Sequence, residues 1–355
     1  MSPAAQHKLV SPFSSLDPSA LPPPLMTAQG VPFHPIWQLI PALSPFYTSY
    51  EKHFDATASF IFLYRHTWVP LLATALYFAF CYYGPKAMRH RKAFDLKTIL
   101  CLWNLSLSLI SFAGAVRVGT HLLYLLSPWG GFSFRDTICE SPEATYADNA
   151  TGLWCVVFTV SKLLELVDTI FVVLRKKPLI FLHWYHHATV LLCSWFGHVT
   201  FTPALYFMAI NYSIHGVMYM YFFLMAIKKV PQWFNPMWLT VAQISQMFVG
   251  IWVIVMSCYY KYFEGAQGEG MGKGCAIDGR MIVAICLMYS TYLVLFVKFF
   301  VQRYAGQQKR KGAREVAVVG KEDKATMTDR KRHMELNILA SDREEVKDEF
   351  RVKKE

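Results

Sequence analysis

The stretch His183-Trp184-Tyr185-His186-His187 lies inside an apolar run from Leu179 to Gly197, and the rest of the chain is organised around it. If this run is a helix, the three histidines fall at positions i, i+3 and i+4 and share one face. Imidazoles in a membrane-buried helix are costly unless they face a polar cavity or one another. The chemistries open to them are metal ligation, proton transfer and nucleophilic attack on an acyl carbon.

The composition indicates a membrane protein. Of the 355 residues, 54% are hydrophobic and only 17% are charged, which is too apolar for an ordinary soluble domain of this length. The net charge of +11 comes from short loops and a tail, so we expect no nucleic-acid partner. The eight cysteines form no CxxC pair and no zinc spacing, so we expect no metal site and no cofactor. Residues 1–50 lack the charged start and apolar core of a cleavable signal peptide.

Seven apolar segments are each long enough to cross a hydrocarbon core of about 30 Å. We expect these spans at Thr67–Gly84, Thr98–Leu126, Ala150–Leu174, Leu179–Gly197, Pro203–Ile227, Pro236–Tyr260 and Met281–Arg303. The sequence therefore predicts an all-α, polytopic membrane protein with three parts. Residues 1–66 form an N-terminal extension that is mostly disordered, residues 67–304 form a seven-helix domain, and residues 305–355 form a charged tail.

Lysine and arginine gather in alternate loops and in the tail, whereas the other loops are neutral or acidic. By the positive-inside rule, the basic loops and the tail are cytosolic and the N-terminus is lumenal. Cys139 and Cys275 then both fall in lumenal loops, where conditions are oxidising, so we expect a disulfide between them. Two free thiols are the alternative. The glycosylation sequon at Asn149 also lies on the lumenal side, although it is close to the third span.

Polar side chains recur at one depth in several spans. Besides the histidines, they are Lys162, Glu165, Asp168 and Thr169 in the third span, Asn211, His215, Tyr219 and Tyr221 in the fifth, and Thr240, Gln243 and Gln246 in the sixth. Counted from the cytosolic end of each helix, these groups lie roughly 10 to 20 Å deep. A shared depth in helices of alternating direction predicts a buried polar site in the cytosolic half. For single residues a structural role stays open, such as an internal Lys162–Glu165 ion pair or glutamines that join helices.

Four motifs, in this order, resemble the signatures of the ELO family of fatty acid elongases. They are Lys162-Leu-Leu-Glu165-Leu-Val-Asp168-Thr169, His183-Trp-Tyr-His186-His187, Asn211-Tyr-Ser-Ile-His215-Gly-Val-Met218-Tyr219-Met-Tyr221 and Thr240-Val-Ala-Gln243-Ile-Ser-Gln246. The resemblance covers about Trp68 to Tyr304. One departure is Phe222, where many members have an aromatic residue with a hydroxyl. Pro178 and Trp184 resemble the members that act on saturated or monounsaturated acyl-CoA.

The resemblance implies a 3-oxoacyl-CoA synthase of the endoplasmic reticulum membrane. Such an enzyme condenses malonyl-CoA with a long-chain acyl-CoA, releases CoA and CO2, and begins each two-carbon elongation cycle. The expected partners are membrane lipid and the three enzymes that complete the cycle: 3-oxoacyl-CoA reductase, a dehydratase and enoyl-CoA reductase. A homo-oligomer is left open.

Roles for the polar residues follow from this chemistry and from the family together. We expect His186 to attack the thioester, His215 to polarise the reacting centre, and His183 and His187 to orient it. Lys162 would counter substrate charge, with Glu165 and Asp168 holding it in position. Supporting contacts are expected from Thr169, Asn211, Tyr219, Tyr221, Gln243 and Gln246, and CoA phosphate contacts from Arg175, Lys176, Lys177 and Lys228. The acyl chain would run in an enclosed tunnel toward the lumen.

Two other functions share parts of this pattern. Membrane di-iron desaturases and hydroxylases also use HxxHH motifs, but they need about eight histidines in several boxes. This chain has a single HxxHH, and an iron analysis would discriminate. A transporter or receptor is the second alternative. Transporters typically have repeats and broken helices, whereas the third to sixth spans of this sequence are predicted to be unbroken.

Overall fold

The computed structural model describes residues 25–26, 32–128, 130–146, 148–264, 275–305, 328–329 and 331–332. The chain divides into two units, residues 1–296 and residues 297–355. The described part of the second unit comprises the end of α13, the π-helix η4 (Val301–Ala305) and four residues near 330. Most of the tail predicted for residues 305–355 lies outside the described residues.

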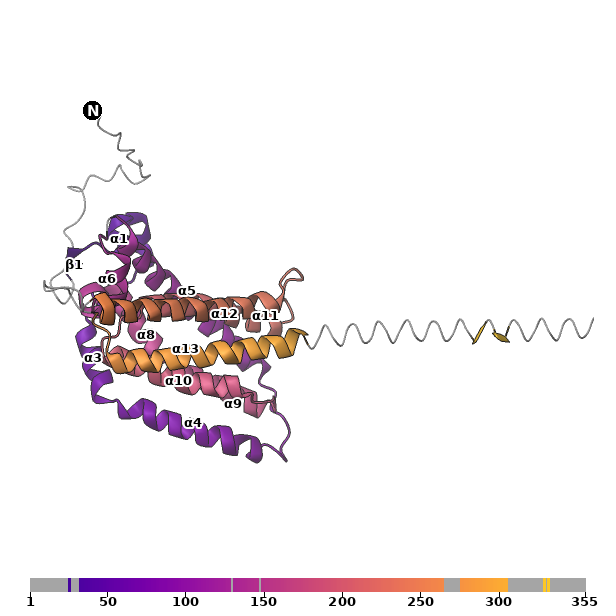
Figure 1. Cartoon of the computed structure of the whole chain (residues 1–355). Helices are drawn as coiled ribbons and strands as arrows, with labels where there is room; N and C mark the ends of the chain where they lie inside the picture. Colours follow the sequence, from indigo (N-terminus) through magenta and orange to yellow (C-terminus); the bar gives the residue numbers. More distant parts are fainter. Residues whose placement is uncertain are drawn as a thin grey trace, which may run out of the picture. The chain divides into compact units, whose positions relative to one another are not determined.

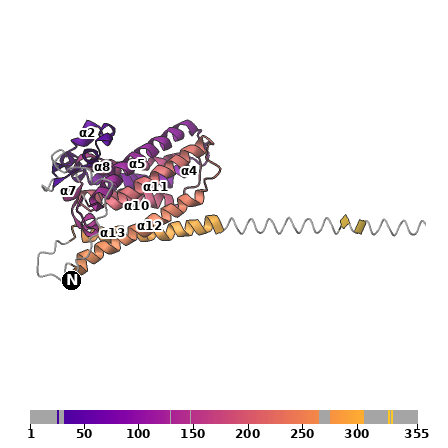
Figure 2. The same cartoon turned by 90° about the horizontal axis from the view of Figure 1, so that it is seen from above.

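The first unit is built from helices, and the longer ones run side by side in Figures 1 and 2. Their bounds are α3 Ala56–Arg65, α4 Trp68–Ala87, α5 Lys97–Leu126, α8 Asn149–Glu165, α9 Val167–Leu174, α10 Phe181–Val199, α11 Leu205–Ala226, α12 Pro236–Tyr259 and α13 Gly279–Phe300. The short elements are β1 Leu25–Met26, β2 Pro32–Phe33, α1 Ile36–Leu39, η2 Pro41–Phe46, α2 Ser49–Lys52, α6 Phe134–Cys139, α7 Pro142–Thr145 and η3 Tyr260–Glu264. Apart from the antiparallel pair β1–β2, the regular elements of the described residues are helical, as the sequence predicts.

Among the described residues, three helical stretches are long and apolar enough to cross a membrane: Lys97–Leu126, Pro236–Phe263 and Gly279–Tyr304. The other predicted spans also coincide with helices, but α10 and α11 carry polar side chains and α8 and α9 are short. The count of seven spans therefore stays a prediction. The chain is nevertheless a membrane protein with several spans.

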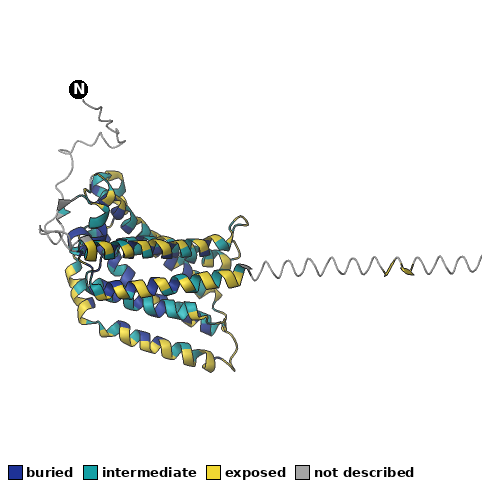
Figure 3. Cartoon of the chain, in the orientation of Figure 1, coloured by how far each residue is buried: buried dark blue, intermediate teal, exposed yellow. Residues whose placement is uncertain are grey.

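Helix α5 has the side-chain distribution of a membrane span. Leu102, Leu109, Val116 and Leu123 are exposed and recur every seven residues, so they form one apolar stripe on the outside. The buried side of the same helix carries Asn104, Ser108 and Ser111. Figure 3 shows that the other long helices also have exposed residues on their outer sides. Apolar side chains outside and polar ones inside are what a lipid environment requires.

Helices α5 and α11 pack closely through two glycines. A Cβ atom on Gly114 would lie 2.5 Å from the Tyr212 ring, and one on Gly216 would lie 2.9 Å from the Phe112 ring. Small residues allow such close approach of membrane helices. The Ser108 hydroxyl donates to Gly216 O at 2.8 Å at the same contact. This packing fixes α11, which carries Asn211 and His215.

The third predicted span is not one continuous helix. It divides into α8 and α9 at Leu166, where Leu166 N bonds to Leu163 O and Thr169 N bonds to Leu166 O. Bonds of this i to i+3 kind tighten a helical turn. The break is not at a glycine or proline, so the sequence gives no signal for it. Glu165 and Asp168 lie on either side of it, and their carboxylates have different hydrogen-bond partners.

Two further features lie at the α6 end of the unit. Cys139 and Cys275 form a disulfide, the pairing expected from the predicted topology. Residues 36–65, which fall in the extension expected to be mostly disordered, form α1, η2, α2 and α3. Glu51 of α2 pairs with Arg117 of α5 at 2.9 Å, and this contact attaches the N-terminal elements to the long helices.

Candidate active site

The predicted polar residues of α8, α10 and α11 meet inside the first unit. The ring centroids of His186 and His215 lie 6.5 Å apart, and those of His186 and His187 lie 5.4 Å apart. The ring centroids of His183 and His187 lie 4.5 Å apart. His187 and His215 are buried, and His183 and His186 are half-buried. The structure therefore brings all four histidines into one cluster.

Lys162 and Glu165 form a buried ion pair beside the histidines. Lys162 Nζ lies 2.7 Å from Glu165 Oε1 and also donates to Asn211 Oδ1 at 3.1 Å. A buried charge is tolerated only when it is paired and hydrogen-bonded. The other carboxylate oxygen, Glu165 Oε2, has no hydrogen-bond partner among the described residues and lies 3.8 Å from His215 Nδ1. One carboxylate thus holds the lysine and faces a histidine.

The hydrogen bonds of Asp168 involve groups other than Lys162. The sequence suggests that it holds Lys162, but its hydrogen bonds come from Trp103 Nε1 at 2.6 Å and Tyr219 Oη at 2.7 Å. The Tyr219 ring in turn lies 5.6 Å from the His215 ring in a T-shaped arrangement. The Asp168 carboxylate of α9 therefore contacts α5 through Trp103 and α11 through Tyr219.

Thr169 connects the histidine cluster to α4. Its Oγ1 atom lies 2.9 Å from His183 Nε2 and 2.8 Å from Tyr77 Oη. On the opposite side, Tyr292 Oη donates to His186 O at 3.1 Å, and the two rings lie 5.0 Å apart. Trp103, Tyr77 and Tyr292 were not predicted as site residues. A Trp or Tyr in an apolar helix needs a partner for its polar atom, and this requirement was the available signal.

Several predicted residues have their contacts outside this cluster. Tyr221 packs against Phe234 with ring centroids 5.4 Å apart, and Gln243 Nε2 lies 3.4 Å from Met218 Sδ. Lys176 Nζ donates to Arg89 O and Arg91 O. The basic residues lie where helices end: Arg175, Lys176 and Lys177 follow α9, and Lys228 follows α11.

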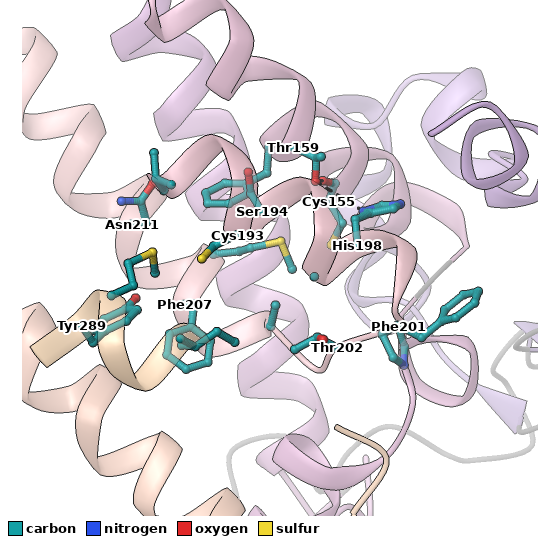
Figure 4. Close-up of a pocket in the computed structure, with 18 of the residues that line it drawn as sticks. Cys155, Thr159, Cys193, Ser194, His198, Phe201, Thr202, Phe207, Asn211 and Tyr289 are labelled. Carbon is teal, nitrogen blue, oxygen red and sulfur yellow. Dashed lines mark hydrogen bonds between the residues drawn. The ribbon is translucent and has the colours of Figure 1, made fainter. Parts of the chain in front are cut away.

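An elongated cavity of about 130 Å³ begins at the histidine cluster. His186, Asn211, Gln246 and Tyr292 line it at the level of the cluster, and most of the remaining lining is apolar. Figure 4 shows Asn211 and Tyr289 at one end of this pocket, Phe201 and Thr202 at the other, and Cys193 between them. The cavity follows α10 from His186 to Gly197, about 17 Å at 1.5 Å per residue.

Within the part of the chain that the structure describes, no three His, Cys, Asp or Glu side chains are arranged to hold a metal ion. The histidines instead contact Thr169, Tyr219 and Tyr292.

Comparisons with known proteins agree on one family. The model of the GNS1/SUR4 (ELO) family matches residues 62–312. Very long chain fatty acid elongase 6 from Mus musculus is 36% identical over 263 residues, which cover 74% of this chain and 94% of the relative. The Drosophila melanogaster elongase of the same name is 36% identical over 277 residues, which cover 76% of this chain and 84% of the relative. Very long chain fatty acid elongase 3 from Homo sapiens is 38% identical over 227 residues, which cover 62% of this chain and 77% of the relative.

Proposed function

Because this chain belongs to the ELO family and is a fatty acid elongase, we propose that it is a very-long-chain 3-oxoacyl-CoA synthase. The reaction joins malonyl-CoA to a long-chain acyl-CoA and releases CoA and CO2. The observation that carries this proposal is the cluster of four histidines beside the Lys162–Glu165 pair, at one end of an elongated, mostly apolar cavity. Such a site offers a nucleophile, a charge for an anionic substrate and space for an acyl chain.

In the first step, an imidazole nitrogen of His186 attacks the carbonyl carbon of the acyl-CoA thioester. The C–S bond breaks, the imidazolium gives up its proton, and CoA leaves as the thiol. In the second step, the C–C bond to the malonyl carboxylate breaks and CO2 departs. The carbanion that remains attacks the acyl-imidazole, the C–N bond breaks, and the imidazole takes up a proton. The sum is one 3-oxoacyl-CoA, one CoA and one CO2, with one proton consumed.

The neighbouring residues support this chemistry from their places in the cluster. Lys162 is fixed by Glu165 and Asn211, so its positive charge can attract the malonyl carboxylate. His215 faces His186 and polarises the reacting carbonyl, while Glu165 Oε2 is near enough to orient His215. Thr169 and Tyr292 restrain His183 and His186. No cofactor is required, because both substrates arrive already activated as thioesters.

The remaining parts of the proposal concern the substrate and the cell. The acyl chain, saturated or monounsaturated, enters the apolar cavity, and Arg175, Lys176, Lys177 and Lys228 attract the CoA phosphates. The enzyme works in the endoplasmic reticulum membrane with its N-terminus lumenal and its C-terminus cytosolic. The 3-oxoacyl product goes to a reductase, a dehydratase and an enoyl-CoA reductase.

The test is an assay of the full chain in microsomes with labelled malonyl-CoA and a panel of acyl-CoAs. We expect 3-oxoacyl-CoA two carbons longer than the substrate, and loss of this product in His186→Ala. His53→Ala, which changes an exposed histidine outside the cluster, is the matched control. Labelled acyl-CoA without malonyl-CoA should leave label on the wild-type protein and none on His186→Ala. Normal turnover and labelling of His186→Ala would overturn the assignment.

A further inference from the structure

The short helix α3 lines the end of the cavity that is remote from the histidines. Ala56 and Phe60 of α3 border it there, together with Pro142, Tyr146 and Thr202. Ala56 and Phe60 both precede residue 62, where the family match begins. The family pattern therefore does not specify these side chains, although they border the proposed acyl cavity.

Helix α3 is attached at both of its ends. At the first turn, Ala56 N donates to Asp148 Oδ1 at 3.0 Å. Near the last turn, Trp195 Nε1 of α10 donates to Leu63 O at 3.1 Å, and both side chains are about 1% exposed. A hydrogen bond at each end and the buried contact of Leu63 with Trp195 hold the helix in place. Its inner face is therefore a fixed wall of the cavity.

Phe60 closes this wall by stacking on Phe201. The two ring centroids are 4.3 Å apart and the planes are inclined by 25°. Phe201 follows the end of α10 and has a φ of 49°, in the left-handed region that a bulky residue rarely adopts. A conformation of this kind persists only where its surroundings hold it. Both aromatic rings line the cavity, so together they form a barrier at its end.

We propose that α3 is the floor of the acyl cavity and that Phe60, stacked on Phe201, sets the longest acyl chain that the enzyme extends. The proposal rests on the proposed function, in which the thioester carbon reacts at His186. With the carbonyl fixed there, the methyl end of the chain advances along α10 toward Phe60. A chain that is too long meets the stacked rings before its thioester reaches His186. Chain length is then measured between a catalytic histidine and an N-terminal helix.

The experiment compares full-length wild type, Phe60→Ala and Phe60→Trp across saturated acyl-CoAs of increasing length. We expect Phe60→Ala to extend substrates at least one two-carbon step longer than wild type does. The kcat/KM for the first substrate beyond the wild-type limit should rise about tenfold, the scale of discrimination by one or a few methylene groups. Phe60→Trp should shorten the limit.

Phe62→Ala is the matched control, because Phe62 lies on the same helix but is 56% exposed and is not part of the cavity lining. The dependence of its kcat/KM on acyl-chain length should equal that of wild type. If Phe60→Ala does not fold, Phe60→Leu removes part of the ring volume at a smaller cost in packing, and the same shift is expected. Identical profiles for all active variants would overturn the inference and leave the synthase intact. Absence of malonyl incorporation by wild type would instead overturn the proposed function.

Discussion

The Nδ1 atom of His215 lies 3.8 Å from Oε2 of Glu165, the carboxylate whose other oxygen accepts from Lys162 at 2.7 Å. One buried side chain therefore connects a cation to a histidine of the proposed reaction centre. Buried ion pairs contribute little net stability, but removal of one partner leaves the other charge uncompensated. Measurements of stability and of turnover can therefore distinguish a structural role of Glu165, as the counter-charge of Lys162, from a role in positioning His215.

We predict that Glu165→Gln destabilises the protein by about 3 kcal/mol, because the Lys162 charge would remain buried without its counter-charge. The double variant Lys162→Met/Glu165→Gln should recover most of this loss, since neither charge is then present. Unfolding in detergent measures both effects. Turnover should stay low in the double variant, because the site has lost its charges. A double variant as unstable as the single one would contradict the prediction.

The hydrogen bond from Trp103 to Asp168 yields a second prediction. Trp103→Phe keeps an aromatic ring but removes the donor, so Asp168 Oδ1 loses its 2.6 Å partner. Tyr219, which shares this carboxylate and contacts the His215 ring, should then be less well positioned. We expect kcat to fall about tenfold with little change in KM, as for a residue that acts through another. Trp238→Phe, at an exposed tryptophan, should leave both constants unchanged.

The central polar residues were predictable because helix periodicity and depth place them together. Lys162 and Glu165 are three residues apart on one helix face, and the step of four from Asn211 to His215 does the same on α11. Membrane burial makes such residues stand out against the apolar background. The contact of Lys162 with both Glu165 and Asn211 agrees with this reasoning.

Other parts of the site could not be read from the sequence for physical reasons. Trp103, Tyr77 and Tyr292 each need a partner for one polar atom, but the sequence does not show which group that partner is. The break at Leu166 involves no glycine or proline, so local composition does not indicate it. Helix α3 follows a Pro-rich segment and is held by residues that are far away in the sequence, such as Trp195. Tertiary contacts determine these features, and local propensity does not.

A third prediction concerns acid and the pairing of Glu51 with Arg117. Burial raises the pKa of Glu51, but hydrogen bonds from Arg117, Trp154 and the Thr48 backbone outweigh burial and lower the pKa from 4.5 to about 2. A depressed folded-state pKa adds stability that is present above the unfolded value and is lost as the pH falls. The stability difference between wild type and Glu51→Gln should therefore be constant above about pH 5 and shrink between about pH 4.5 and 2. Melting temperatures at several pH values measure it, and a pH-independent difference would contradict it.

A fourth prediction follows from the disulfide between Cys139 and Cys275, which closes a loop with a sequence separation of 136 residues. The remaining six cysteines are free, so alkylation of the denatured protein should add six labels without reductant and eight after reduction. Cys139→Ser should lower the free energy of unfolding by about 2 to 4 kcal/mol, because the bond restricts the unfolded chain. Cys286→Ser, at an exposed free cysteine, is the control and should unfold as wild type does. Eight labels without reductant would show that the bond is absent. The α6 loop and the segment before α13 would then be held together only by contacts such as the 2.8 Å bond from Ala276 N to Cys139 O.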